Sequence, residues 1–170
     1  MSLRGAVIFD RDGVLNQDIG YCHTPERFVW TDGAREAVKA VNDAGLYAFV
    51  ATNQSGVGRG YYAEADVLAL HDWMQAELAA VGAHVDAIAY APHHPEAADP
   101  RYREGAEFRK PRPGMILDLL ARFPVDPSRT VMIGDKPSDI EAAEAAGVEG
   151  LKFSGGSLLS FVAPVIARLR

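Results

Sequence analysis

The sequence has almost no cysteine and no long hydrophobic stretch. Cys22 is the only cysteine among 170 residues, which excludes a disulfide framework and a metal cage built from several cysteines. No apolar run approaches the roughly 20 residues of a membrane-spanning helix. Residues 1–4 lead directly into a strand-like segment, which leaves no room for a signal peptide. We therefore expect a cytoplasmic protein without a membrane partner.

Positive charge is also scarce and dispersed. The formal net charge is -6 and there is no long block of Lys or Arg, so no nucleic-acid partner is expected. A small phosphorylated metabolite needs only local positive charge, which Arg109, Lys110 and Arg112 supply. The chain is too short for two domains of ordinary size, so we expect residues 1–170 to form a single domain, and a monomer.

Short β-branched or aromatic runs alternate with longer segments of helical period. This pattern predicts an α/β fold with a doubly wound, mostly parallel, Rossmann-like sheet and helices on both faces. The expected strands are 6–9, 47–51, 87–90, 131–133 and, more weakly, 151–153. The expected helices include 37–44, 67–81 and 114–123, and an alanine-rich one that Ser138 would cap and Gly147 would end. His71 and His84 are interpreted as ordinary residues of a helix and of a helix end.

Polar clusters follow three of the expected strands. Residues 10–13 come after the first strand, residues 52–56 after the second, and residues 134–139 after the fourth. Each cluster alone is also typical of a turn, a helix cap or a solvated surface. Because the carboxyl ends of parallel strands share one edge of the sheet, the three clusters together favour a single crevice that all of them line.

The side chains of these clusters suit phosphoryl transfer. That reaction needs an in-line nucleophile, a proton donor for the leaving oxygen, and positive charge around the transferred group. Asp10 and Asp12 alternate along an extended segment, so one can reach the phosphorus while the other stands beside the leaving group. A carboxylate nucleophile would form an acyl phosphate, which water then cleaves.

Other residues of the clusters could bind a metal and the phosphoryl oxygens. Asp10, Asp135 and, as a further candidate, Asp139 provide the hard oxygen ligands that Mg²⁺ prefers. The metal would also screen the repulsion between an anionic nucleophile and an anionic substrate. Thr52 offers a hydroxyl, the backbone N–H groups after it offer donors, and Lys110 offers a compact cation. The sequence therefore predicts a Mg²⁺-dependent phosphatase.

The order of these motifs along the chain resembles that of the haloacid dehalogenase-like (HAD) hydrolases. The resemblance covers nearly the whole chain and rests on Asp10-x-Asp12, Thr52, Lys110 and Gly134-Asp135 with Asp139. It implies that Asp10 is the nucleophile and that Asp12 is the general acid and then the general base. It implies that Thr52 and Lys110 hold the phosphoryl group. It also implies that Asp10, the backbone carbonyl of Asp12, and Asp135 bind Mg²⁺.

A narrower resemblance points to the D,D-heptose 1,7-bisphosphate phosphatases, whose framework the histidinol-phosphate phosphatases share. It rests on Asp10-Arg-Asp-Gly-Val-Leu-Asn16, Asp18-x-Gly20-Tyr21, Thr52-Asn-Gln-Ser-Gly56, Arg59-Gly60, His93-His94-Pro95, Arg109-Lys110-Pro111-x-Pro113-Gly114-Met115 and Gly134-Asp135-Lys136. Histidinol-phosphate members tend to carry Asp at the place of Ser55, so Ser55 with Arg59-Gly60 favours the heptose branch. The resemblance implies substrate contacts from Asp18, Gly20, Tyr21, Asn53, Gln54, Ser55, Arg59, Arg109 and Lys136.

Members of that family usually carry a structural zinc in a Cys-x-His and Cys-x-Cys arrangement on the segment 92–113, called here the long loop. The matching positions read Ala91-Pro92-His93 and Ala106-Glu107-Phe108, so only the histidine remains. We therefore expect no structural zinc, and expect Tyr102 and Phe108 to anchor the long loop. The motif spacing leaves no room for a cap domain, so loops 14–31, 53–62 and 92–113 would select the substrate.

Two alternatives remain open. The first is a histidinol-phosphate phosphatase or a broad small-ester phosphatase. A cationic amino alcohol would call for carboxylates around its amine, whereas these loops contain Arg59, Arg109, Arg112 and Lys136. The second is a receiver-type signalling module, which also combines Asp, Thr or Ser, and Lys on a doubly wound sheet. Such a module has no need of an acid such as Asp12, which disfavours this alternative.

Overall fold

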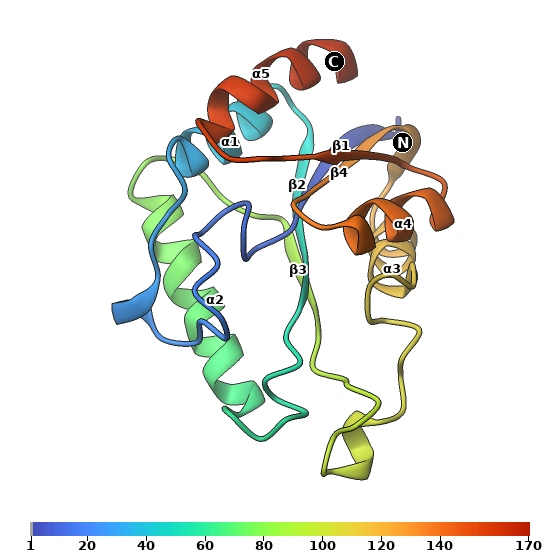
Figure 1. Ribbon diagram of the computed structural model, residues 1–170. Helices are drawn as coiled ribbons and strands as arrows, with labels where there is room; N and C mark the ends of the chain where they lie inside the picture. The colour runs from blue at the N-terminus through green and yellow to red at the C-terminus, as the bar shows by residue number, and fades with distance from the viewer. Residues whose placement is uncertain (1) are drawn as a thin grey trace.

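The computed structural model describes residues 2–170 and contains a sheet of five parallel strands (Figure 1). The strands are β1 (Arg4–Phe9), β2 (Tyr47–Asn53), β3 (Ala87–Ala91), β4 (Val125–Gly134) and β5 (Glu149–Lys152). Their order across the sheet is β3-β2-β1-β4-β5, and all neighbouring pairs are parallel. The predicted doubly wound α/β fold is confirmed.

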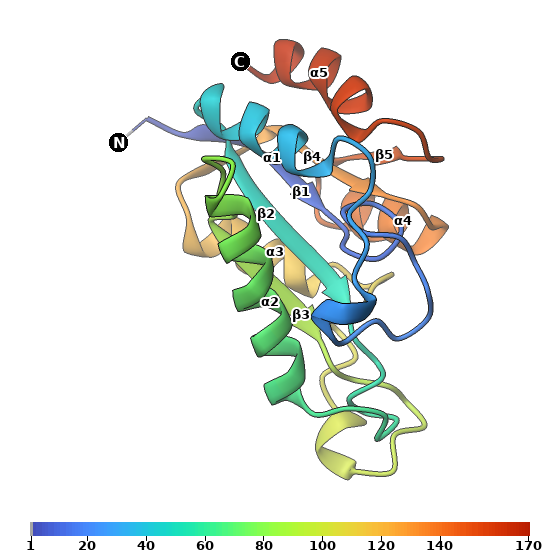
Figure 2. The ribbon, with the colours of Figure 1, turned by 90° about the vertical axis from the view of Figure 1, so that its left-hand side faces the viewer.

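Helices cover both faces of the sheet (Figure 2). On one face, α1 (Ala34–Asp43), α2 (Glu64–Ala79) and α5 (Leu158–Leu169) share one buried apolar cluster with the strands. On the other face, α3 (Gly114–Arg122) and α4 (Pro137–Ala145) share a second cluster. Two short 3-10 helices, Pro25–Arg27 and Pro100–Tyr102, lie within loop 14–31 and the long loop.

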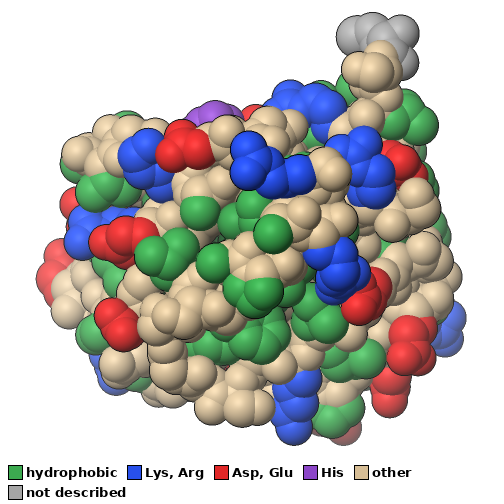
Figure 3. Space-filling model, turned by 90° about the horizontal axis from the view of Figure 1, so that it is seen from above, with side chains coloured by type: hydrophobic (Ala, Val, Ile, Leu, Met, Phe, Trp, Pro, Cys, Tyr) green, Lys and Arg blue, Asp and Glu red, His purple; other side chains and the backbone are tan. Residues whose placement is uncertain are grey.

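The surface carries both signs of charge. In the space-filling view from the end of the molecule where α5 lies, Lys and Arg side chains are interspersed with Asp and Glu side chains (Figure 3). None of the helices within residues 2–170 combines the length and the apolar character needed to cross a bilayer.

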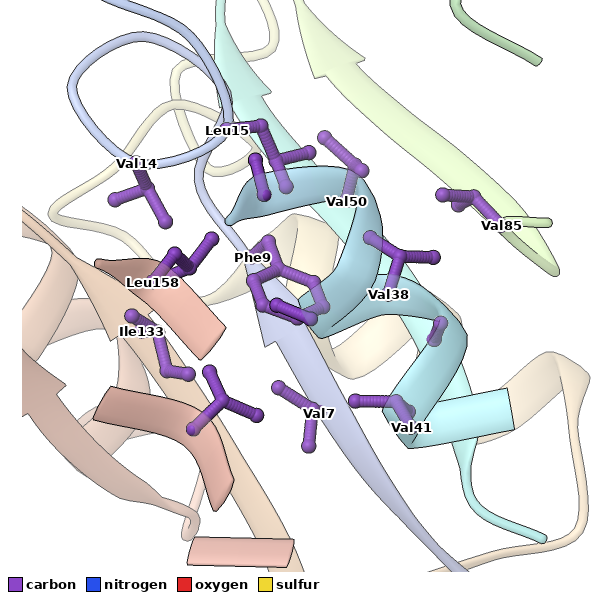
Figure 4. Close-up of a cluster of buried hydrophobic side chains, with 14 of the residues drawn as sticks. Val7, Phe9, Val14, Leu15, Val38, Val41, Val50, Val85, Ile133 and Leu158 are labelled. Carbon is purple, nitrogen blue, oxygen red and sulfur yellow. The ribbon is translucent and has the colours of Figure 1, made fainter. Parts of the chain in front are cut away.

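Side chains of the central strand alternate between the two apolar clusters. Val7 and Phe9 lie beside Val38 and Val41 of α1 (Figure 4), whereas Ile8 packs in the cluster on the other face. The three β1 side chains are fully buried, which is why this strand forms a continuous hydrophobic run in the sequence. The polar residues of this segment lie at its ends, with Arg4 at the start of β1 and Asp10 directly after Phe9.

The topology places these ends in one crevice. From β1 at the centre, the chain builds β2 and β3 on one side and then crosses to β4 and β5 on the other. The direction of winding reverses between β1 and β4, where open α/β sheets bind their ligands at the carboxyl edge. Pairing of Phe9 with Ile133 brings Asp10 next to Gly134 and Asp135.

The structure also corrects two expectations about helices. Ser138 lies inside α4, whose N-cap position is Lys136, and the Asp139 carboxylate accepts the N–H groups of Asp135 and Lys136. Helix α5 is absent from the expected helices. Pro164 in its interior argues locally against a helix, but five buried apolar residues at helical spacing hold it on the sheet: Leu158, Val162, Val165, Ile166 and Leu169.

Candidate active site

The carboxyl edge of the sheet gathers a lysine and three aspartates. Lys110, in the loop before α3, donates from Nζ to Asp10 Oδ1 at 3.0 Å, to Asp139 Oδ1 at 2.6 Å and to the Ala51 carbonyl at 2.9 Å. Carboxylate oxygens of Asp10, Asp135 and Asp139 lie within 4.8 Å of one another. The structure thus brings together residues from three separate sequence motifs, as predicted.

Burial controls the charge of this cluster. It raises the pKa of Asp10 to about 7, with Lys110 opposing the rise and the Asp139 carboxylate adding to it. Burial also raises the pKa of Asp135. It would by itself lower the pKa of Lys110, but the adjacent Asp10 and Asp139 carboxylates outweigh it and raise that pKa. Three carboxylates face one ammonium group, so full ionisation is unfavourable without a further cation.

The cluster fits a divalent cation such as Mg²⁺. Asp135 Oδ1 is buried and has no hydrogen-bond partner among the described residues. The backbone of Gly13, at a φ of 90°, lies close to the Asp135 carboxylate. Only glycine allows this, since a β-carbon at position 13 would overlap that carboxylate. Asp139 already uses Oδ1 for Lys110 and Oδ2 for two backbone N–H groups. Asp10 and Asp135 are therefore available as metal ligands, and Asp139 holds their surroundings in place.

Asp12 lies beside this cluster and is held by a separate set of donors. Its Oδ1 accepts hydrogen bonds from Arg11 Nη2 and Asn16 Nδ2, both at 3.0 Å. Its Oδ2 accepts one from Gln54 Nε2 at 3.1 Å. The side chain is 22% exposed and lines a large pocket. The two aspartates thus have different surroundings, as their alternation along the chain predicts.

The large pocket has a volume of about 570 Å³ and adjoins the aspartates. Its lining includes all nine residues expected to contact substrate, namely Asp18, Gly20, Tyr21, Asn53, Gln54, Ser55, Arg59, Arg109 and Lys136. A cavity of about 50 Å³ beside Asp10 shares Asp12, Asn53, Lys110, Lys136 and Ser138 with the large pocket. The small cavity is therefore the place next to the predicted nucleophile, and the large pocket leads to it.

Three residues of the pocket lining were not named as substrate contacts: Tyr62 and Pro111, which lie in loops expected to select the substrate, and Ser138, which was expected only as a helix cap. Ser138 lines both cavities from the first turn of α4. The position of Ser138 in the polar cluster 134–139 could have indicated a place in the site. The sequence predicted a helix cap at Ser138 instead. Tyr62 ends loop 53–62, and its hydroxyl donates to Gln54 Oε1 at 2.7 Å.

Thr52 and Gln54 bind mainly to other protein groups. Thr52 is fully buried and lines neither cavity, and its Oγ1 accepts a hydrogen bond from Gln54 Nε2 at 2.9 Å. The backbone N–H of Gln54 donates to the Ala91 carbonyl at 2.8 Å. That N–H is therefore not available to a phosphoryl group, and the expectation for donors after Thr52 is restricted to the other N–H groups of residues 53–56. The Gln54 side chain instead connects Thr52 to Asp12.

Three cations besides Lys110 line the large pocket, namely Arg59, Arg109 and Lys136. Lys136 Nζ lies 3.6 Å from Asp18 Oδ2, and Arg59 Nη2 lies 2.8 Å from His94 Nε2. Arg109 is half-buried, and its Nη1 is buried with no partner within residues 2–170. Burial and the neighbouring Arg59 both lower the pKa of Arg109. An anionic group of a ligand would compensate this guanidinium.

The long loop is held by a carboxylate and two tyrosines. Glu64 of α2 accepts hydrogen bonds from the hydroxyls of Tyr90, at 2.7 Å, and Tyr102, at 2.9 Å. Tyr102 also packs against a small buried apolar cluster, so its predicted role as an anchor is confirmed. Phe108 is 38% exposed, with its ring stacked on that of His93, and it buries less surface than expected.

Glu64→Leu is therefore expected to lower the free energy of unfolding by about 1–3 kcal/mol, because two hydrogen bonds to a charged group are lost. It should also make the long loop more sensitive to limited proteolysis. Denaturant titration and timed digestion measure the two effects. Glu141→Leu, at an exposed position on α4, is the matched control. Equal effects of both substitutions would exclude Glu64 as the anchor.

Comparisons with known proteins agree with this arrangement. A family model described as HAD-hydrolase-like matches residues 107–157, which include Lys110, Asp135 and Asp139. The D-glycero-beta-D-manno-heptose-1,7-bisphosphate 7-phosphatase of Rhodopseudomonas palustris is 47% identical over 98% of this chain and 93% of its own length. This chain belongs to the HAD-like heptose-bisphosphate phosphatase family. The Escherichia coli enzyme of the same name is 39% identical over 84% of this chain and 75% of its own length.

Solved structures place the fold in the same family. The D,D-heptose 1,7-bisphosphate phosphatase of B. bronchiseptica, complexed with magnesium and phosphate, has a TM-score of 0.79 and 35% identity. The match covers 96% of this chain and 87% of that one. A HAD-like phosphatase from Mesorhizobium loti has a TM-score of 0.87 and 28% identity, over 99% of this chain and 88% of that one. Both of these structures thus share the fold described above over nearly the whole chain.

Proposed function

We propose that this protein is a Mg²⁺-dependent phosphatase that removes the 7-phosphate of D-glycero-D-manno-heptose 1,7-bisphosphate, with Asp10 as the nucleophile. The relatives are named for this substrate and this position. The observation that carries the substrate assignment is Arg109, whose guanidinium is buried in part, lacks a partner at Nη1 and lines the pocket next to Arg59. A guanidinium there suits a second phosphate, distinct from the one beside Asp10.

The first half-reaction uses the two aspartates in different roles. A carboxylate oxygen of Asp10 bonds to the phosphorus of the 7-phosphate while the bond from phosphorus to the sugar oxygen breaks. Asp12 donates a proton to the departing sugar oxygen. Lys110 stabilises the charge on the phosphoryl oxygens. Thr52, predicted to hold the phosphoryl group, is fully buried here, and its Oγ1 accepts from the Gln54 amide that also binds Asp12.

The second half-reaction returns the enzyme to its starting state. Water attacks the phosphorus of the aspartyl phosphate, Asp12 takes the proton of that water, and phosphate leaves with Asp10 restored. Mg²⁺, when bound by Asp10, the backbone carbonyl of Asp12, and Asp135, supplies positive charge that screens the carboxylates from the phosphate. Asp139 keeps Lys110 and the turn at Asp135 in place throughout.

Histidinol phosphate is a poorer fit to the pocket. Its amine would need a free carboxylate, and the Asp18 carboxylate in the lining lies 3.6 Å from Lys136 Nζ. Arg59 and Arg109 would repel the amine from the other side. A receiver-type module is disfavoured because Asp12 is built into the pocket by three donors, an arrangement that a phosphate acceptor alone does not need.

The proposal includes a monomer that acts in the cytoplasm on a soluble sugar phosphate, without a nucleic-acid or membrane partner. The net charge of -6 supports the absence of a polyanionic partner. Cys22 is buried and free, which suits a reducing compartment.

The substrate assignment predicts a particular effect of Arg109→Ala. We expect kcat/KM for the heptose 1,7-bisphosphate to fall about 10–100-fold, the value of a lost charged hydrogen bond, while kcat/KM for the 7-monophosphate changes little. Arg112→Ala, at an exposed position of the same loop, is the control and should leave both values unchanged. Released phosphate is measured across both sugars and histidinol phosphate, which should rank last. Equal losses on mono- and bisphosphate would contradict the assignment.

The protein is also predicted to contain no structural zinc. His93 belongs to no group of three or more metal-ligating side chains within residues 2–170, and tetrahedral zinc needs four ligands. Elemental analysis of protein purified without chelator should give zinc far below one equivalent, in samples with full Mg²⁺-dependent activity. Zinc near one equivalent that survives dialysis, and whose removal opens the long loop to proteolysis, would refute this prediction.

A further inference from the structure

Arg11 is a buried cation behind the active site, in contact with Asp12, and the reaction above gives it no role. It is 1% exposed and is among the largest fully buried side chains of the protein. Burying a charge costs several kcal/mol unless partners compensate it. An apolar side chain of the same volume would fill this space without the cost of burying a charge. The contacts of Arg11 therefore indicate the role of its charge.

Both ends of the guanidinium have specific partners. Nη2 donates to Asp12 Oδ1 at 3.0 Å and to the backbone carbonyl of Cys22 at 2.6 Å. Nη1 lies 3.3 Å from His71 Nε2 on α2. Arg11 therefore connects the aspartate at the pocket, the backbone of loop 14–31 and a helix that covers the sheet.

His71 acts as the acceptor at the inner end of this chain of contacts. It is 5% exposed, and burial together with the Arg11 charge lowers the pKa of His71 to about 3. The ring is therefore neutral at any working pH, and Nε2 can accept from Arg11 Nη1. The interpretation of His71 as an ordinary helix residue is thus incomplete, because its partner lies 60 positions away in the chain.

The carboxylate of Asp12 is oriented from both sides as a result. Arg11 and Asn16 bind Oδ1, and Gln54 binds Oδ2, while 22% of the side chain remains exposed. A proton donor must be held within hydrogen-bond reach of the leaving oxygen, and small displacements reduce the rate strongly. We propose that Arg11 is the positioning residue that aims Asp12 at the leaving oxygen, and that His71 fixes the guanidinium of Arg11.

This proposal rests on the proposed roles of Asp10 and Asp12, but it does not depend on which sugar is the substrate. It concerns only the protonation of the leaving oxygen. Its signature is therefore a dependence on the leaving group. An alkyl phosphate needs a well-placed acid, whereas p-nitrophenyl phosphate has a good leaving group that needs little protonation.

The test is Arg11→Lys, measured on heptose 1,7-bisphosphate and on p-nitrophenyl phosphate. Lysine keeps the charge, but a single ammonium cannot serve three partners in the geometry of a guanidinium. The value of kcat/KM reports the steps up to the acyl phosphate. We expect it to fall about 10–100-fold on the sugar phosphate and less than about 3-fold on the aryl ester. The loss on the sugar phosphate would be a part of the roughly 10²–10⁴-fold that acid catalysis contributes. In the Asp12→Asn background, Arg11→Lys should cause no further loss.

Two variants of His71 test the inner contact without altering the charge at Arg11. His71→Leu removes the acceptor and should reproduce the sugar-selective loss on a smaller scale, and His71→Gln should restore most of it. Met74→Ala, at a fully buried apolar position on the same helix, is the control for a weakened core and should affect both substrates equally. These variants also decide the question if Arg11→Lys does not fold.

The proposal is overturned if Arg11→Lys or His71→Leu lowers kcat/KM equally on both esters, or if Arg11→Lys costs as much in the Asp12→Asn background as in the wild type. Failure of the proposed function has a different appearance. The wild-type protein would then fail to turn over heptose 1,7-bisphosphate, and the same leaving-group comparison would be made with whichever alkyl phosphate it does hydrolyse.

Discussion

Asp10→Asn is expected to reduce turnover of the heptose 1,7-bisphosphate by at least about 10⁴-fold, the scale seen when a covalent nucleophile is removed. An amide nitrogen or oxygen cannot form the acyl phosphate, and it is a poorer ligand for Mg²⁺ than a carboxylate. The amide can still occupy the position of Oδ1, where Lys110 Nζ and the N–H of Arg11 donate. The fold should therefore be retained, and phosphate release measures the loss.

The control for this variant is its thermal stability. Burial raises the pKa of Asp10 to about 7, so the charged carboxylate is disfavoured in the fold. Without Mg²⁺, Asp10→Asn should melt no lower than the wild type, because the neutral amide avoids the desolvation of a charge. Asp43→Asn, an exposed carboxylate on α1, should leave activity unchanged. Activity above a few per cent in well-folded Asp10→Asn would remove Asp10 from its role.

Asp12→Asn has the second largest expected effect, a loss of about 10²–10⁴-fold in kcat/KM on the sugar phosphate. The amide can remain bound to Gln54, Asn16 or Arg11 after rotation, but it cannot donate a proton to the alkoxide or accept one from water. The formation of the acyl phosphate from p-nitrophenyl phosphate should be affected far less. Rapid-mixing measurement of nitrophenolate release separates this step from hydrolysis of the acyl phosphate. Equal losses on the two esters would exclude Asp12 as the acid.

The sheet and the position of the site could be predicted because they depend on local patterns. Strand β1 is a short apolar run that ends at the Asp10-x-Asp12 motif, and a parallel sheet has only one carboxyl edge where such motifs can meet. The nine expected pocket residues came instead from the resemblance to the heptose 1,7-bisphosphate phosphatases, and all of them line the large pocket. Lys110 reaches Asp10 across 100 positions only because both motifs lie at that edge.

Features that depend on long-range contacts could not be predicted in this way. The Arg11–His71 contact joins a turn to the buried face of α2, and neither residue has a local signature for it. Gln54 has an ordinary loop sequence around it, yet its side chain is used by Thr52, Asp12 and Tyr62. Helix α5 is a different case, since its apolar spacing is visible in the sequence and Pro164 hides it.

The long loop shows how a predicted absence leaves a structural question open. The sequence indicates that three of four zinc positions are occupied by Ala91, Ala106 and Phe108, but it gives no sign of what replaces the metal. In the structure Glu64 of α2 holds the long loop through hydrogen bonds with Tyr90 and Tyr102. A glutamate at the start of a helix is usually explained by the helix dipole alone, so its link to the loop appears only in the structure.

The most direct test of the account is to identify the residue that carries the phosphoryl group. Asp12→Asn is mixed with Mg²⁺ and p-nitrophenyl phosphate, quenched after the first turnover, reduced with borohydride and digested for mass spectrometry. Borohydride converts an aspartyl phosphate to homoserine, and the slowed second step should let the intermediate accumulate. We predict a burst of nitrophenolate and homoserine at position 10, in samples with both substrate and Mg²⁺. A burst without modification of residue 10, or homoserine at another aspartate, would contradict the central claim that Asp10 is the nucleophile.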